Sequence, residues 1–197
     1  MRRGGMSSRL SAAVLLITAW VHAAASVSAT TLVPADFAQM ARESELIVRG
    51  TVVHVEAQLA GSTRAIESLI TVQVSDTLKG TSAEQTVFRV PGGKVGRYRR
   101  VMVGAPEFAT GDEVILFLKG RAPAIAMPYG LSQGVYRVAR TGGAAVVTPV
   151  VVTGVGRVVR GDPTRRPLDP AAFARQVQSA LTPTAPTDGR RAVPRIR

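Results

Sequence analysis

Between residues 46 and 152, apolar residues recur at every second position, which is the period of a β-strand with one buried face. Ile70, Val72 and Val74, for example, alternate with polar neighbours. Turns that contain glycine or proline separate the apolar runs, and no long helical pattern lies between them. The pattern predicts strands over residues 46–56, 70–74, 86–90, 98–103, 114–118, 134–139 and 144–152.

Three of these runs carry more specific information. Val114–Leu118 is continuously apolar, which indicates a central strand covered on both faces. Gly50 interrupts the first run and suits a β-bulge. Pro149 has no amide hydrogen, so the last run is expected at an edge of the sheet or at a bulge. Strands of this length without long helices indicate an antiparallel barrel or sandwich.

Two short helices are expected, one before the strands and one after them. Pro34 suits the first turn of one helix, and Asp169 suits the N-cap of the other, directly before Pro170. Each helix carries an apolar stripe at helical spacing. The stripes are Phe37, Met40 and Ala41 in the first helix, and Phe173, Val177 and Leu181 in the second.

The first 29 residues have the three parts of a secretory signal peptide. Three arginines precede the apolar run of residues 10–25, and the small residues of 27–29 suit a cleavage site. The run is shorter than the roughly 20 residues that cross a bilayer as a helix. We expect export to the periplasm or the outside, with an uncleaved anchor as the alternative. Residues 30–156 are then the β domain, 157–181 a linker with the second helix, and 182–197 a disordered basic tail.

The net charge of +12 is distributed unevenly. Residues 1–29 contribute +3, residues 157–197 contribute +6, and residues 30–156 contribute only +3. The strand region is therefore nearly balanced, and the basic tail is expected to attract polyanions or membrane surfaces only weakly. The chain has no cysteine, which excludes thiol catalysis and thiolate metal sites. We expect no cofactor and no resident metal.

Ser132 lies in Gly130–Gly134, which matches the G-x-S-x-G pattern of a serine-hydrolase nucleophile elbow. The elbow needs a helix after the serine and a histidine further along the chain. A strand is predicted after Ser132, and no histidine follows it. A glycine-flanked turn is the better interpretation, because a serine without a general base is a poor nucleophile.

Two further groups of polar residues have side chains that sites use. His54 could ligate a metal, but Glu56, Asp112 and Glu113 show no ligand spacing, and a partly exposed strand histidine is the simpler interpretation. Asp112 and Glu113 follow Gly111 in an ordinary turn. Catalysis by a pair of carboxylates, as in glycosidases, remains an alternative, because the sequence does not give the distance between two carboxylates. No catalytic residue is predicted.

One cluster suits the binding of a polyanion. Basic side chains surround an aromatic ring between residues 94 and 100, an arrangement found where proteins bind single-stranded nucleic acid or other polyanions. A solvated hairpin with a packed tyrosine is the alternative. The candidate residues are Lys94, Arg97, Tyr98, Arg99 and Arg100.

Four runs resemble a group of exported, largely uncharacterised bacterial proteins, some of which are associated with secreted metalloproteases of the matrixin type. They are Ile47–Val52, Leu78–Gly80, Val103–Leu118 and Gly130–Val138. Their order is also similar to the netrin-like barrel of tissue metalloprotease inhibitors, an OB-type fold. Those inhibitors place an N-terminal cysteine on the protease zinc, and this chain has none. The resemblance implies an architecture and no active site.

Together these observations predict an all-β domain with two short helices, built as an OB-like, netrin-like antiparallel barrel of five to seven strands. The expected function is that of an exported, non-enzymatic binding or interaction module. The alternatives are an accessory or inhibitor protein of a secreted metalloprotease, which the resemblance implies, and a polyanion binder for nucleic acid or polysaccharide.

Overall fold

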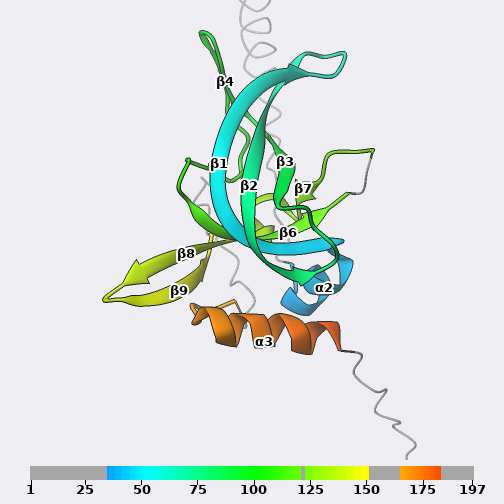
Figure 1. Ribbon diagram of the computed structural model, residues 1–197. Helices are drawn as coiled ribbons and strands as arrows, with labels where there is room; N and C mark the ends of the chain where they lie inside the picture. The colour runs from blue at the N-terminus through cyan, green and yellow to red at the C-terminus, as the bar shows by residue number, and fades with distance from the viewer. Residues whose placement is uncertain (1–34, 121–122, 151–164, 183–197) are drawn as a thin grey trace, which may run out of the picture. The chain divides into compact units, whose positions relative to one another are not determined.

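The computed structural model describes residues 35–120, 123–150 and 165–182 (Figure 1). The expected signal peptide (1–29), residues 157–164 of the expected linker, and all of the expected basic tail except Thr182 lie outside the described residues. The elements in chain order are α2 (Phe37–Glu43), β1 (Leu46–Ala60), β2 (Ala65–Lys79), β3 (Gln85–Pro91), β4 (Gly93–Val95), β5 (Tyr98–Arg100), β6 (Glu113–Lys119), β7 (Met127–Pro128), the 3₁₀ helix η1 (Leu131–Gly134), β8 (Val135–Thr141), β9 (Ala144–Pro149) and α3 (Pro170–Leu181).

Seven strands form one antiparallel sheet, which confirms the all-β fold class with two short helices. The strand order is β3-β2-β1-β6-β8-β9, and β7 pairs with β6 beside β8. β4 and β5 form a separate two-stranded hairpin. β9 lies at the end of the order, as Pro149 predicted.

The prediction of a closed barrel is wrong, because the sheet is open. Within the described residues, the backbone pairing between β3 and the β7 side is one parallel bridge from Phe88 to Ala126, with the Arg89 amide donating to the Ala126 carbonyl at 2.9 Å. β7 is two residues long and ends at Pro128, which has no amide hydrogen with which to extend a ladder. One bridge therefore joins β3 to the β7 side, whereas a closed barrel needs a continuous ladder of hydrogen bonds there.

β6 is the central strand that its apolar run predicted. It pairs with β1 on one side and with β7 and β8 on the other, and all five residues of Val114–Leu118 are buried. Alternate residues serve two different cores. Ile115 and Phe117 face the helices, whereas Leu116 faces the opposite side of the sheet.

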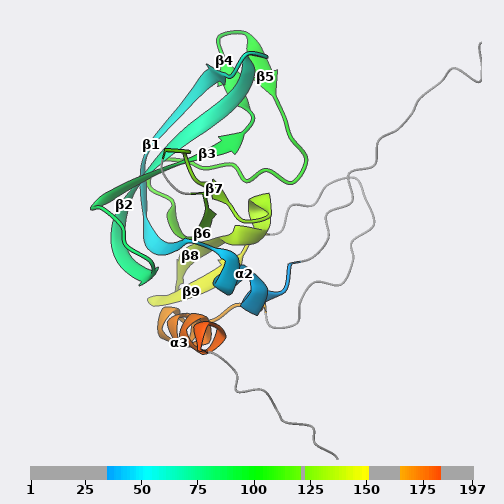
Figure 2. The ribbon, with the colours of Figure 1, turned by 90° about the vertical axis from the view of Figure 1, so that its right-hand side faces the viewer.

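The helix-side core is built around four aromatic rings. Phe37 of α2 and Phe173 of α3 meet at 5.8 Å between ring centroids, and Phe173 lies 4.7 Å from Tyr136 of β8. Phe117 contacts all three, at 5.6–6.2 Å. Figures 1 and 2 show α2 and α3 side by side against this end of the sheet. The apolar stripes predicted for both helices point into this core.

Several element boundaries differ from prediction. α2 begins at Phe37, where the Asp36 carboxylate accepts from the Gln39 amide at 2.7 Å, rather than at Pro34. The strand expected over residues 98–103 ends at Arg100.

Two local predictions are confirmed. α3 begins at Pro170 with Asp169 as its N-cap, as predicted. A register shift at Gly50 confirms the bulge in β1.

Two polar contacts tie α2 to the sheet. The Lys79 ammonium donates to three backbone carbonyls at the end of the helix, at 2.6–2.9 Å. The Glu43 carboxylate accepts from Gln39, Lys119 and Tyr129, and these hydrogen bonds, that of Gln39 first, lower its pKa from the ordinary 4.5. Neither described helix has the length and apolar character that a membrane span requires.

Candidate functional site

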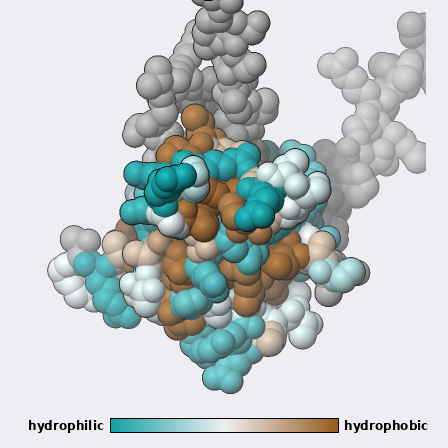
Figure 3. Space-filling view, turned by 90° about the horizontal axis from the view of Figure 1, so that it is seen from above, coloured by the Kyte–Doolittle hydropathy of each residue, from teal (hydrophilic) through white to brown (hydrophobic). Residues whose placement is uncertain are grey.

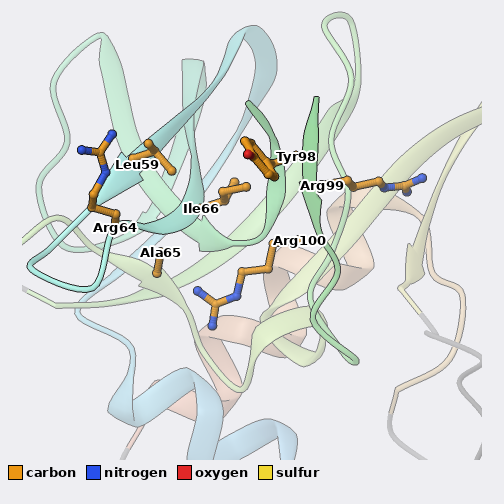
Figure 4. Close-up of a pocket in the computed structure, with 7 residues that line it drawn as sticks. All are labelled: Leu59, Arg64, Ala65, Ile66, Tyr98, Arg99 and Arg100. Atoms are coloured by element: carbon orange, nitrogen blue, oxygen red, sulfur yellow. The ribbon is translucent and has the colours of Figure 1, made fainter. Parts of the chain in front are cut away.

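An open hollow of about 480 Å³ lies where the end of the β1–β2 pair meets β5 (Figure 4). Its lining comes from two parts of the chain that are more than thirty residues apart. Leu59, Ile66 and the Tyr98 ring provide apolar surface, and three arginines complete the lining. The lining residues are Leu59, Arg64, Ala65, Ile66, Tyr98, Arg99 and Arg100. We call this set the basic hollow.

The long β1–β2 pair forms one wall. Leu59 pairs with Ile66, and Ala60 with Ala65, next to a turn in which Gly61 and Arg64 have positive φ angles of 67° and 49°. Ile66 is buried, whereas Leu59 keeps 42% of its surface exposed. The β1–β2 pair therefore presents a partly exposed apolar face to the hollow.

The β4–β5 hairpin is fixed against this wall by close backbone contact. Gly93 has a φ of 131°, and a Cβ there would lie 2.5 Å from Ser68 Oγ and 3.0 Å from Ala57 Cβ. The buried Ser68 hydroxyl donates to the Gly92 carbonyl at 2.9 Å, and the Gly92 amide donates to the Ile66 carbonyl at 3.0 Å. Only glycine permits this approach without displacement.

All five predicted site residues lie on this hairpin, but they do not all line the hollow. Tyr98, Arg99 and Arg100 do, while Lys94 on β4 and Arg97 in the turn do not. The Arg97 guanidinium lies 5.0 Å from the centroid of the Tyr98 ring and donates to the Tyr98 hydroxyl at 2.8 Å. Arg97 thus orients the ring that borders the hollow.

The cations differ in how they are neutralised. Arg99 forms an ion pair with Glu107 at 3.2 Å, and Figure 4 shows its guanidinium pointing away from Leu59, Ile66 and Tyr98. Within the described part of the chain, Arg64, Lys94 and Arg100 have no carboxylate within 4.0 Å. Their charges are available to an anionic ligand.

His54 lies away from the hollow. Its pairing with Thr71 places it on the opposite face of β1 from Val55 and Leu59, and its side chain is 64% exposed. The nearest carboxylate is that of Glu56, at 3.7 Å. Over residues 35–120, 123–150 and 165–182, no three histidine, aspartate or glutamate side chains gather as a metal site would need.

Ser132 occupies the 3₁₀ helix η1 and is only 2% exposed. Strand β8 follows directly, as the sequence predicted, and the Ser132 amide donates to the Gly104 carbonyl at 3.0 Å. This geometry differs from that of a nucleophile elbow, in which the serine is exposed at the start of a helix. The motif serves as a turn between β7 and β8.

Asp112 and Glu113 are held in ion pairs that brace β1, β6 and β8. Asp112 contacts Arg137 at 2.5 Å, and Glu113 contacts Arg49 at 2.5 Å. Burial alone would raise the pKa of Asp112, but hydrogen bonds from Arg137 and the Ala109 amide, together with the Arg137 charge, outweigh it and lower that pKa. The carboxylates thereby join strands rather than face a common cleft.

Sequence reasoning missed the β1–β2 half of the hollow. Leu59, Arg64 and Ile66 carry no motif, and the run predicted for the first strand ended at residue 56. The turn at Gly61 was the available signal, because it marks where an extended hairpin would reverse. No protein-family model, curated protein or solved structure matches this chain.

Proposed function

We propose that this chain is an exported, non-enzymatic binding module that takes an anionic ligand at the basic hollow. The observation that carries the proposal is the position of Arg64 and Arg100. Neither guanidinium group has a carboxylate within 4.0 Å in the described chain, and both residues line the hollow beside its apolar and aromatic side chains. Arginine beside an aromatic ring is a recurrent arrangement for binding anionic groups.

Export is supported by the signal-peptide pattern of residues 1–29. The resemblance to exported proteins associated with metalloproteases carries the alternative of an accessory or inhibitor protein. No described contact favours that alternative over binding at the hollow, so the hollow is the feature to test first.

Retention on immobilised heparin, a general anionic probe, tests the proposal. The hollow variant combines Arg64→Asn with Arg100→Gln, and asparagine suits the left-handed conformation of residue 64. The control variant combines Arg166→Asn with Arg175→Gln, which removes the same charge from exposed positions at α3. Both variants keep the basic residues of 183–197, so their difference reports on the hollow alone.

We expect the hollow variant to elute at clearly lower salt than the wild type, because two direct contacts to the anion are lost. The control variant should elute close to the wild type. Equal shifts for the two variants would mean that retention depends only on net charge, and the assignment of the hollow would be wrong.

A further inference from the structure

Resting on the proposed function, we infer that the anionic ligand of the basic hollow is the surface of a lipid bilayer that carries acidic headgroups. The end of the sheet formed by the β1–β2 turn and the β4–β5 hairpin would lie against the headgroup layer. The apolar side chains at this end would enter the interface, and the arginines would bind the headgroups.

Exposed apolar side chains gather at this end of the sheet. Leu59 is 42% exposed, Tyr98 60%, and Val101, which directly follows β5, 70%. Figure 3 looks onto this end and shows apolar surface between hydrophilic side chains. A single exposed apolar residue is ordinary, but Leu59 and Tyr98 share the lining of one hollow, and such a shared apolar surface suits contact with an apolar environment.

The charges are complementary to an acidic bilayer. Arg64 and Arg100 flank the apolar side chains without carboxylate partners in the described chain. Anionic bilayers attract such residues over about a Debye length. Tyrosine and arginine also suit the headgroup region, because each joins an apolar body to a polar end.

The shape separates a bilayer from a soluble polyanion. The hollow is open, and Figure 1 shows the β1–β2 turn and the hairpin that contains β4 ending on the same side of the sheet, so both can touch one extended surface. A sulfated sugar or a nucleic acid backbone would use the guanidinium groups but leave Leu59 in water. An amphiphilic surface uses both kinds of side chain.

Sedimentation with vesicles tests the inference. The probes are phosphatidylcholine vesicles with and without phosphatidylglycerol, offered to the full chain, the hollow variant and the control variant. Each arginine near an acidic bilayer is worth about a fivefold change in partitioning, so the hollow variant should bind the acidic vesicles about 25-fold more weakly. The control variant should stay within about twofold of the wild type, because its charges do not touch the surface.

A second pair of variants tests the apolar contact without changing charge. Leu59→Thr should weaken binding to acidic vesicles about fivefold, since part of an apolar side chain no longer leaves water. Val87→Thr is its match, because Val87 is similarly exposed but lies on the face of β3 opposite to the buried Phe88. Val87→Thr should leave binding unchanged.

The outcomes separate this inference from the proposed function. If heparin retention depends on the hollow but the chain does not bind acidic vesicles, the inference of a bilayer ligand is overturned and the proposed function is retained. Vesicle binding that Leu59→Thr and Val87→Thr leave equally intact also overturns the bilayer contact. The absence of any effect of the hollow variant on either probe overturns both.

Discussion

Replacing Gly93 by alanine should lift the β4–β5 hairpin from the β1–β2 wall and so dismantle the basic hollow. The added methyl would lie 2.5 Å from Ser68 Oγ and 3.0 Å from Ala57 Cβ, so that one of these contacts must open. Ser68 has little freedom to move, because it is buried and donates its hydroxyl hydrogen to the Gly92 carbonyl. The hairpin is therefore the part that gives way.

The cost has two sources. A φ of 131° is accessible almost only to glycine, and an alanine there costs about 1–3 kcal/mol. Overpacking a buried contact costs about 1–3 kcal/mol more. We expect the free energy of unfolding to fall by about 3 kcal/mol. Gly96→Ala is the matched control, because φ is 57° and no atom lies within 4 Å of its added Cβ, which leaves only a cost of about 1 kcal/mol.

Urea unfolding followed by circular dichroism measures both variants, and heparin retention measures the site. Gly93→Ala should lose more stability than Gly96→Ala and should also elute at lower salt, whereas Gly96→Ala should elute with the wild type. Equal unfolding free energies for the two variants would refute the close contact between the hairpin and the β1–β2 wall.

Three further predictions concern the packing that supports the sheet. Phe117→Ala should lower the free energy of unfolding by about 3–5 kcal/mol, because the ring is fully buried among three other aromatic rings, and an unchanged thermal midpoint would contradict the central position of β6. Lys79→Met should cost about 1–3 kcal/mol in urea, since three carbonyls at the end of α2 lose their donor, and a neutral result would show that water replaces the ammonium. The lowered pKa of Glu43 stabilises the fold above the ordinary value of 4.5, and that contribution is lost as pH falls through the folded pKa. Glu43→Gln should therefore flatten the fall of stability with acid in unfolding curves recorded over a pH series, and an unchanged slope would count against the contacts to Gln39, Lys119 and Tyr129.

Patterns that depend on neighbours in sequence were predictable. The continuous apolar run of Val114–Leu118 indicated the central strand, because only a strand covered on both faces excludes polar residues. Asp169 before Pro170 indicated the start of α3, since capping is decided within one turn. The class of fold follows from such local signals.

Features that depend on distant pairing were not predictable. The expected barrel does not close because β7 is short and ends in proline, and the longer apolar runs of the sequence do not reveal so short a strand. The basic half of the site was visible as a cluster between residues 94 and 100. The apolar wall of the site was not visible, because the sequence near Leu59 and Ile66 does not show that the β4–β5 hairpin packs beside them. Gly93 allows the β4–β5 hairpin to contact the β1–β2 pair. The sequence does not reveal this role, because it depends on Ser68, a distant residue, lying against Gly93.

Amide chemical shifts of the isotope-labelled chain, titrated with a short-chain phosphatidylglycerol, test the central claim most directly. The predicted result is a set of shifts confined to the β1–β2 turn and the β4–β5 hairpin, with Leu59, Ile66, Tyr98 and Arg100 among the residues most affected. Shifts concentrated in α3, or spread over the chain without preference for the hollow, would contradict it.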